Sequence, residues 1–503
     1  MKLASKNGAR DPGARRAVSG KALSALLVGV GGAFAVSLCA CITAGGDLPP
    51  PAGAAGPSPQ LAAAVAPGPP DPPSPFKLKP EWDGPCKRAE TVDVNLGNAP
   101  EAFVRAAHCQ ITGKEPPPKT VELWAAKLRK DEEHVRRIDV VRTLAKEADR
   151  DVTKLAYSDP WESEVELLDA PVHATKRDIG AVFMFFFGCP GATNCEMNWA
   201  NTHAPGMDAP SPAMGAGPGQ KGFYAPTEVG FWRRELSDAK YAGLQFLMLN
   251  TYGPDIEDGK LAPLAKALEG LDHPIQIALF DDTWTWGQPY FGEFWKQKPN
   301  LRDTEKTATL LYEAKWRPFF RQIDKKHWYR FKGRPFIYFY NSGTLLPADH
   351  AAAVLRQMKA KFKEEFGEEP FVDVDTAYFA DQDMPKVADA RFTWVTFNLP
   401  DKLWYSRLNG HTVEHAMVRW DAVGRDRPKD VAKPSDRLIK DGSVLKQVLS
   451  YSSNAELLIL ATWNDLGEGT GVNRNYDYYA GGRWLEPDYF MRMIRASQSG
   501  HQP

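Results

Sequence analysis

The sequence predicts an α/β fold, a (β/α)8 TIM-like barrel that is preceded by a small helical segment. Seven apolar runs of strand length recur over about 330 residues, together with a weaker eighth run near HAMVRW. Most of these runs are apolar on both faces, as parallel strands covered by helices are. Amphipathic segments with helical spacing lie between several of them. One barrel accounts for this number and length, whereas a doubly wound open sheet, the competing fold, would show a glycine fingerprint after its first strand.

The first segment, residues 1–41, is predicted to be an export signal. A basic leader is followed by the apolar run ALSALLVGVGGAFAVSLCAC, which ends in small residues. The tetrapeptide that ends in Cys41 resembles a bacterial lipobox, in which Cys41 is the lipidated residue. Twin-arginine export through Arg15 and Arg16 and an uncleaved N-terminal anchor are the alternatives. We expect the protein to be secreted or to be held in the bacterial cell envelope, on the membrane, by a lipid anchor.

Two further segments precede the expected barrel. Residues 42–80 are mostly Pro, Ala and Gly with almost no large apolar residues, which predicts a disordered linker. Residues 81–164 are charged and have apolar residues at helical spacing, with an interruption near Asp131, which predicts a helical N-terminal region. The barrel is expected to occupy residues 165–503.

The cysteines fit an exported protein. If residues 1–41 are an export signal that ends in a lipobox, then of the six cysteines Cys39 leaves with the signal and Cys41 carries the lipid. The four that remain are Cys86, Cys109, Cys189 and Cys195. An even number in an oxidising compartment predicts two disulfides, and sequence proximity favours pairing the first with the second and the third with the fourth. Zinc binding is the weaker alternative, because no His-rich motif accompanies these cysteines.

The expected barrel elements follow one another along the chain. The strand-length runs are IGAVFMFFF, LQFLMLNTY, PIQIALF, RPFIYFY, PFVDVDTAY, ARFTWVTFNL and ELLILATW. In AAAVLRQMKAKF the apolar residues fall on one helical face, and in DGSVLKQVL the hydroxyl of Ser443 can cap a helix. Asp373 and Asp375 share one face of their strand, so we expect at least one of them to point into the barrel core.

Polar and aromatic residues recur where these strands end. In a (β/α)8 barrel the active site lies at the carboxyl ends of the strands. The residues that we expect to bind substrate there are Asn250, Tyr252, Asp281, Asp282, Trp284, Tyr340, Asn341, Asn464 and Tyr478. Some have structural alternatives: the two aspartates can cap a helix, and Tyr340-Asn341 can belong to a turn. We expect His203, in a loop of Pro and Gly, to be incidental.

Asp465 and Glu468 are the expected catalytic pair. An Asp-x-x-Glu pattern also forms a capping box, but that requires a helix, and the following GTGVNRN is a poor helix former. Cleavage of a glycosidic bond needs a proton donor and a second carboxylate, which these two residues can supply. The nearby aromatic residues, Tyr478 among them, offer flat faces to sugar rings.

The motif WNDLGEGTG resembles a signature of barrel glycosidases in glycoside hydrolase families 71 and 99. The run YAGLQFLMLNTYGPDIEDGKLAPLAKALEG, with the later RNYDYY and WLEPD, resembles a bacterial family of uncharacterised function, DUF5010. The resemblance to the glycosidases implies that Glu468 is the general acid and Asp465 the second carboxylate. In family 99 that carboxylate acts through the sugar 2-hydroxyl, whereas in family 71 enzymes water is the attacking group. Retention and inversion of configuration therefore both stay open.

These observations predict an exported glycoside hydrolase that acts on an exogenous polysaccharide or glycan. A non-catalytic carbohydrate-binding lipoprotein is the first alternative, and a metal-dependent hydrolase that uses Asp281, Asp282, Asp375 and His203 is the second. We expect no metal and no organic cofactor. Because the net charge is −1, with 62 basic and 63 acidic residues, we expect no nucleic-acid partner. The sequence leaves the oligomeric state open.

Overall fold

The computed structural model describes the C-terminal barrel and the helical region before it. The described residues are 82, 84–93, 99–129, 137–150, 156–158, 177–185, 226, 229–251, 261–269, 271, 275–282, 300–340, 346–394, 405–419, 441–451, 455–465, 470–475, 478–480 and 482–498. The predicted export signal, the linker, Cys41, Cys189, Cys195 and His203 lie outside these residues. In the described part of the chain, no helix has both the length and the apolarity needed to cross a membrane.

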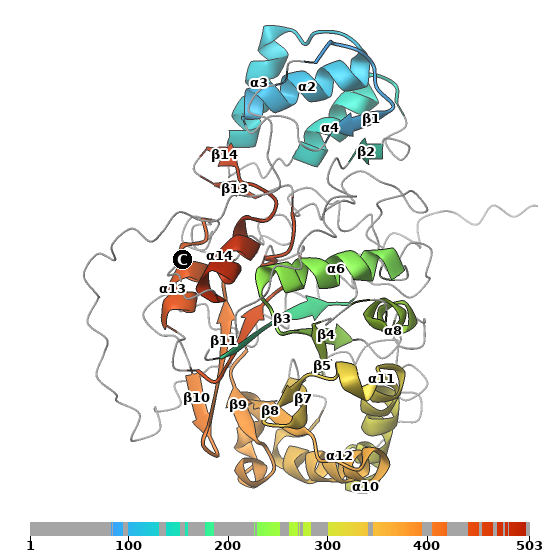
Figure 1. Ribbon diagram of the computed structural model, residues 1–503, viewed down its shortest axis with the longest axis vertical. Coiled ribbons are helices and arrows are strands. Elements are labelled where there is room, and N and C mark those ends of the chain that lie inside the picture. Colours follow the sequence, from blue (N-terminus) through green and yellow to red (C-terminus); the bar gives the residue numbers. More distant parts are fainter. Residues whose placement is uncertain are drawn as a thin grey trace, which may run out of the picture. The chain divides into compact units, whose positions relative to one another are not determined.

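Eight of the described strands form a parallel sheet that is nearly closed into a barrel (Figure 1). They are β3 (Asp178–Met184), β4 (Phe246–Thr251), β5 (Gln276–Asp282), β7 (Arg334–Tyr340), β8 (Phe371–Asp375), β9 (Ala390–Phe392), β11 (His411–Met417) and β12 (Leu457–Ala461). Each pairs with the next one in chain order as far as β9, β11 pairs with β12, and β12 returns to pair with β3. This cyclic order confirms the predicted TIM-like barrel.

One junction of the barrel differs from the others. Strand β10 (Tyr405–Leu408) forms an antiparallel hairpin with β11, and β9 lies beside both of them without a ladder to either. The barrel is therefore nearly rather than fully closed between β9 and β11. The short strand β6 (Arg330–Phe331) adds to β7 at its amino end, and β13 (Tyr479–Ala480) pairs with β14 (Arg483–Trp484) after the last barrel strand.

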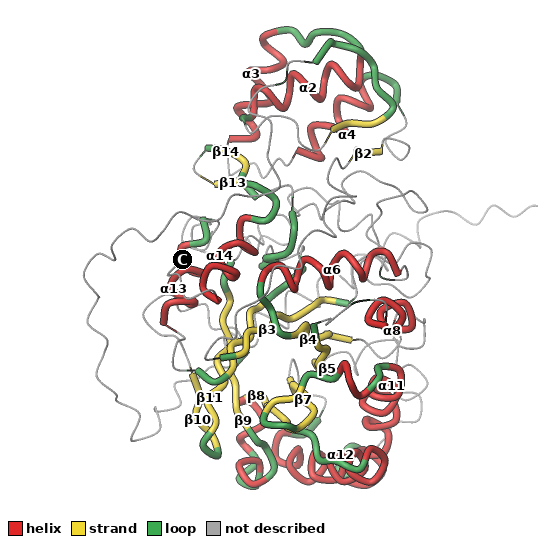
Figure 2. Tube along the Cα trace, viewed as in Figure 1, coloured by secondary structure: helices red, strands yellow, loops and turns green. Residues whose placement is uncertain are grey.

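Helices cover the outside of the sheet (Figure 2). They are α6 (Val229–Ala242), α8 (Leu261–Glu269), α10 (Thr304–Leu311), the π-helical turn η6 (Tyr312–Trp316), α11 (Arg317–Gln322), α12 (Ala351–Phe366), α13 (Ser443–Tyr451) and α14 (Tyr489–Gln498). Short 3-10 turns are η7 (Lys325–His327), η8 (Ala348–His350), η9 (Thr376–Ala380) and η10 (Met384–Lys386). Asp303 caps the start of α10 by accepting the backbone N–H of Lys306, and Gly367, whose φ of 79° favours glycine, caps the end of α12.

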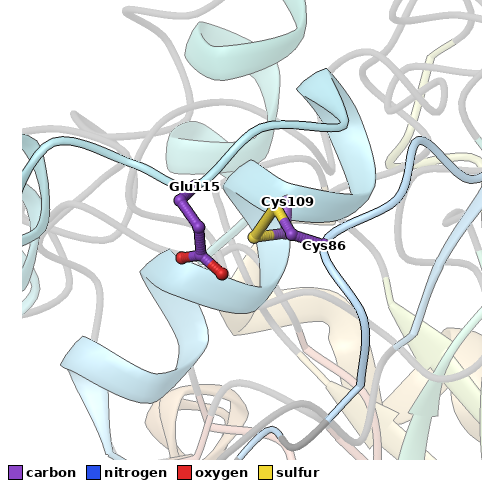
Figure 3. A group of neighbouring side chains, drawn as sticks. All are labelled: Cys86, Cys109 and Glu115. Carbon is purple, nitrogen blue, oxygen red and sulfur yellow. A yellow bond between two sulfur atoms is a disulfide. The ribbon is translucent and has the colours of Figure 1, made fainter.

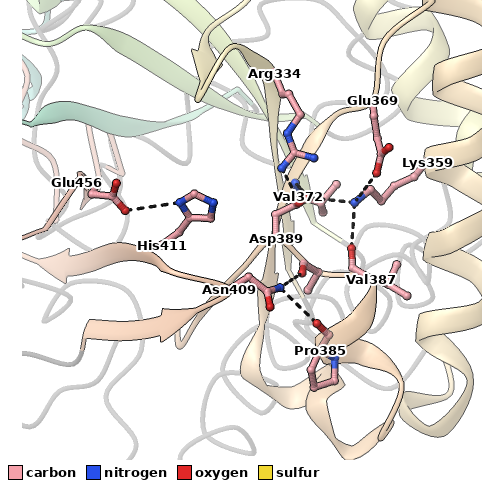
Figure 4. A network of polar contacts seen from close by, with 11 residues as sticks. Arg334, Lys359, Glu369, Val372, Pro385, Val387, Asp389, Asn409, His411 and Glu456 are labelled. Carbon is pink, nitrogen blue, oxygen red and sulfur yellow. Dashed lines mark hydrogen bonds and ion pairs between the residues drawn. The ribbon is translucent and has the colours of Figure 1, made fainter.

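The amino end of the barrel is joined by an ion-pair network (Figure 4). Asp389, just before β9, accepts hydrogen bonds from Arg334 at the start of β7 and from the backbone N–H of Val372 in β8. Lys359 of α12 donates to the same carboxylate at 2.9 Å and to the backbone oxygen of Val387. The network fixes three strands and one helix to each other at the end of the barrel that, in this fold, contributes stability rather than catalysis.

The N-terminal region contains the three helices α2 (Pro100–Thr112), α3 (Pro118–Arg129) and α4 (Arg137–Glu147), as the sequence predicts. It also contains a small parallel sheet of β1 (Thr91–Asp93) and β2 (Ala156–Ser158), which the helical pattern does not indicate. These elements have a hydrophobic core of their own, and Trp484 of β14 packs into that core against Phe103.

A disulfide joins Cys86 to Cys109 of α2, which is the pairing that sequence proximity favours. Glu115 lies beside the two sulfur atoms (Figure 3). This is the one group of Cys, His, Asp and Glu side chains among the described residues whose ligand atoms lie close enough to share a metal ion. Because the sulfur atoms are bonded to each other, neither is the thiolate that zinc requires.

Candidate active site

Polar side chains from five strands gather inside the carboxyl half of the barrel. We call them the interior polar cluster; they are Asn250 of β4, Asp282 of β5, Tyr338 and Tyr340 of β7, Asp373 and Asp375 of β8, and His415 of β11. All seven are buried or nearly so. Alternation along the strands explains their common direction, because successive side chains of a strand point to opposite faces of the sheet.

Aromatic contacts across the barrel show that this direction is inward. The ring of Tyr338 stacks on Phe392 of β9 with centroids 3.6 Å apart, although β8 separates the two strands. Phe280 of β5 contacts Trp394, which follows β9, at 5.3 Å. Side chains from strands that are not neighbours can meet in this way only across the interior. Phe339, by contrast, contacts Trp316 of the outer helices.

Asp373 and His415 form a buried pair across the interior. The Nε2 atom of His415 lies 3.0 Å from the Oδ2 atom of Asp373. Burial raises the pKa of Asp373 and lowers the pKa of His415, while the hydrogen bond between them opposes both shifts. A carboxylate partner requires a hydrogen on Nε2, so in the neutral imidazole the Nδ1 atom is left as an acceptor.

The hydroxyl of Tyr338 lies amid the acidic side chains. Burial, followed by the negative charges of Asp373, Asp375 and the other acidic groups around it, raises the pKa of Tyr338 well above its ordinary value. The phenol therefore keeps its proton at neutral pH, and it can donate a hydrogen bond.

Asp465 lies at the carboxyl end of β12 in a loop that folds back on itself. Its backbone N–H donates to the hydroxyl of Thr462 at 2.8 Å, and its carbonyl accepts the N–H of Thr470. Thr462 also donates its N–H to the carbonyl of Thr470. Glu468, the expected general acid, falls among residues 466–469, which lie outside the described residues. Asp465 and Thr470, which flank that segment, are hydrogen-bonded to each other.

Helix α6 holds this loop from outside the barrel. Trp463 donates its indole N–H to Glu235 at 2.7 Å, and Arg474 donates to Asp238 at 3.0 Å. All four residues are buried. Burial and the neighbouring Asp238 raise the pKa of Glu235 to about 7.

Three of the residues expected to bind substrate make contacts within the protein. Asn464 bonds the backbone of Met184 on β3, Asp281 pairs with Lys315 on the outer face of the sheet, and the hydroxyl of Tyr478 donates to the carbonyls of the loop at Gly471 and Asn473. Their roles as substrate ligands stay predictions without support from these contacts.

The structure brings three of the predicted substrate residues together in the interior polar cluster. They are Asn250, Asp282 and Tyr340, and the side-chain amide of Asn250 lies 3.5 Å from Asp282. Four others, Tyr252, Trp284, Asn341 and the catalytic candidate Glu468, lie outside the described residues.

Sequence reasoning missed the contributions of Tyr338 and His415. The alternation of aromatic residues in RPFIYFY carried a signal, since Phe336, Tyr338 and Tyr340 share one strand face. The sequence indicates the position of His415 only weakly, because its strand, the run near HAMVRW, is the weakest of the eight apolar runs.

Three solved structures show a distant similarity to this chain. The family 99 endo-α-mannosidase from Bacteroides thetaiotaomicron in complex with Bis-Tris-propane shows 12% sequence identity over 65% of this chain and 98% of that chain, with a TM-score of 0.45. A second structure of that enzyme gives a TM-score of 0.44 at the same identity and the same coverage. A glycoside hydrolase-like protein shows 13% identity over 66% of this chain and 97% of that chain, with a TM-score of 0.43.

No curated protein matches the chain in sequence. The model of the domain of unknown function DUF5010, however, matches residues 221–495, which is more than half of the 503 residues and includes all but the first strand of the barrel. The chain therefore belongs to the DUF5010 family.

Proposed function

We propose that this protein is a glycoside hydrolase that cleaves a polysaccharide or glycan, with Glu468 as general acid and Asp465 as the second carboxylate. One observation carries the proposal: Asp465 leaves β12 at the same end of the barrel at which the interior polar cluster gathers. The carboxyl ends of parallel strands meet at one rim, and active sites of this fold lie there.

The proposed reaction assigns one proton transfer to each carboxyl group. Glu468 donates a proton to the glycosidic oxygen as the bond from that oxygen to the anomeric carbon breaks. Water supplies the hydroxyl group that the anomeric carbon gains, and a carboxylate accepts the proton that the water or the sugar 2-hydroxyl loses. Asp465 is the proposed acceptor, because its backbone is fixed by Thr462 and Thr470.

The surroundings suit a sugar. Trp394, which follows β9 at this end of the barrel, is partly exposed and offers an apolar face, and the interior polar cluster offers hydrogen-bond acceptors. Sugars combine apolar ring faces with hydroxyl donors, so both features have a partner on the same ligand.

The test compares reducing-sugar release by the parent, Glu468→Gln and Asp465→Asn on a panel of α-mannans, α-1,3-glucans and other polysaccharides. We expect each variant to lose roughly a hundredfold or more in rate, the usual contribution of a general acid or base. Glu364→Gln is the matched control, because Glu364 is exposed on α12. The NMR signal of the first anomer released distinguishes retention from inversion.

Two results would change the proposal. Equal rates for the parent and Glu468→Gln would remove Glu468 from the mechanism. Binding of one polysaccharide by the parent without any sugar release would favour the carbohydrate-binding lipoprotein instead.

We also propose that the protein is exported and anchored by lipid at Cys41. The lipobox-like tetrapeptide and the linker that follows it support this location. Radiolabelled palmitate should enter the parent and not Cys41→Ala in a bacterial host; equal labelling of both proteins would contradict the anchor.

A further inference from the structure

Several polar atoms of the interior polar cluster are buried without a hydrogen-bond partner. Among the described residues these include the Oδ1 atom of Asn250, the hydroxyl of Tyr338, the Oδ1 atom of Asp373 and the Nδ1 atom of His415. A buried polar atom of this kind costs free energy, and most such atoms in native proteins have a partner. Four of them in one cluster, on four different strands, indicate a site that is built for a ligand.

The last three of these residues lie side by side. Tyr338 and Asp373 are register partners on adjacent strands, and Asp373 accepts the hydrogen bond from His415 across the barrel. The ring centroids of Tyr338 and His415 lie 4.6 Å apart. Three buried side chains that each carry an unpartnered polar atom thus lie next to one another.

The chemistry of these atoms defines the ligand. The Oδ1 atom of Asp373 and, in the neutral imidazole, the Nδ1 atom of His415 accept hydrogen bonds, while the Tyr338 hydroxyl can donate or accept. An anion is disfavoured, because Asp282, Asp373 and Asp375 surround the phenol. A fitting ligand presents several hydrogen-bond donors close together, which describes the hydroxyl groups of a pyranose ring.

We propose that Tyr338, Asp373 and His415 form a sugar subsite inside the barrel that binds the hydroxyl groups of one pyranose unit. This inference rests on the proposed function in that the sugar would belong to the glycan being cleaved. His415 and Asp373 accept hydrogen bonds from two hydroxyls, and Tyr338 donates to a third oxygen. Asp373 also keeps the imidazole in the tautomer that presents Nδ1 to the sugar.

Sugar affinity of the Tyr338→Phe variant distinguishes a subsite from a purely structural cluster, which would leave that affinity unchanged. The variant removes a buried hydroxyl that has no protein partner, so in either case the melting temperature should stay the same or rise. If the hydroxyl binds sugar, the dissociation constant should rise roughly tenfold, which corresponds to about 1.4 kcal/mol. Asp373→Asn is the second variant. If the amide oxygen still accepts the hydrogen bond from His415, the amide nitrogen replaces the unpartnered Oδ1 atom, so a hydrogen-bond donor stands where the sugar needs an acceptor. The sugar affinity of Asp373→Asn should fall at least as far as that of Tyr338→Phe.

Tyr329→Phe is the matched control. Tyr329 is also a buried tyrosine of the barrel, but its hydroxyl donates to Asp178 at the amino end of β3, at 2.7 Å. Loss of that hydrogen bond should lower the melting temperature and leave sugar affinity unchanged, the reverse of the result expected for Tyr338→Phe.

The measurement is sugar binding by the full chain in a Glu468→Gln background, by calorimetry and thermal shift. The probes are D-glucose, D-mannose, D-galactose and the oligosaccharides from partial acid hydrolysis of α-mannan and α-1,3-glucan. Weaker binding by both cluster variants and unchanged binding by Tyr329→Phe supports the subsite. Unchanged binding by Tyr338→Phe and Asp373→Asn, or no binding of any probe by the parent, overturns it.

The two proposals fail separately. Hydrolysis by the parent with an unchanged KM in Tyr338→Phe rejects the subsite and keeps the enzyme. Binding that depends on Tyr338 in a protein that releases no sugar keeps the subsite and rejects the hydrolase.

Discussion

At the scale of single residues, two adjacent aspartates have opposite environments. Asp282 points into the barrel, whereas Asp281 points outward, where its carboxylate pairs with Lys315 at 3.1 Å and accepts the indole N–H of Trp316 at 2.7 Å. Lys315 also donates to the carbonyl of Asp282 at 2.7 Å. The strand period of two therefore separates an ion-paired carboxylate from a member of the interior polar cluster within one dipeptide.

The ion pair of Asp281 should be sensitive to loss of its cation. Lys315→Met leaves a fully buried carboxylate without its charge partner, and removal of one member of a buried pair costs roughly 3–5 kcal/mol. Urea unfolding at pH 7 measures the loss. Lys306→Met is the control, because Lys306 pairs with Asp303 on the surface and should lose less than about 1 kcal/mol. Similar losses in the two variants would contradict the structural role given to Asp281.

At the scale of elements, the exit of β12 closes the barrel and positions the proposed catalytic loop. The β12–β3 ladder ends at Leu460 and Ala181, and Trp463 then donates its backbone N–H to Val182. Beyond that point the side chain of Asn464 replaces the backbone: it accepts the N–H of Met184 at 2.6 Å and donates to the carbonyl of the same residue at 3.0 Å. One side chain thus continues the sheet next to Asp465.

Asn464→Ala should therefore destabilise the barrel and weaken catalysis together. The N–H and C=O groups of Met184 would both lose a partner inside the protein, at a cost of roughly 2–4 kcal/mol in the free energy of unfolding. Asn300→Ala is the control, since exposed Asn300 also accepts a backbone N–H, that of Arg302. Urea unfolding compares the two variants, and a loss for Asn464→Ala no larger than for Asn300→Ala would show that this junction does not need the side chain.

At the scale of the whole molecule, two buried glutamates, one on helix α6 and one on strand β11, link stability to pH. Burial raises the pKa of Glu235, beneath the proposed catalytic loop, and the pKa of Glu414, on β11, each to about 7. The folded protein therefore holds protons that the unfolded chain has already released between pH 4.5 and 7. Stability contributed by these groups is present below that window and is lost as the pH rises through it.

The free energy of unfolding should accordingly fall between about pH 5 and pH 8, by an upper limit of roughly 3 kcal/mol for each group. Glu235→Gln and Glu414→Gln should each flatten this dependence, because an amide does not titrate. Urea unfolding at the two pH values measures it, with exposed Glu364→Gln as the control. A pH dependence that is the same in all four proteins would show that neither glutamate is responsible.

The sequence by itself determined the barrel, since apolar runs on both strand faces and the helical segments between them are local patterns that report burial directly. The same patterns placed Asn250, Asp282, Tyr340 and Asp465 at the carboxyl ends of strands. The tertiary structure alone decided which polar groups meet: Asn464 bonds a residue 280 positions away, and Asp373 pairs with His415 across the interior. The physical reason is that hydrophobic periodicity depends on neighbours along the chain, whereas a polar partner is chosen by the closure of the sheet, which brings distant strands together.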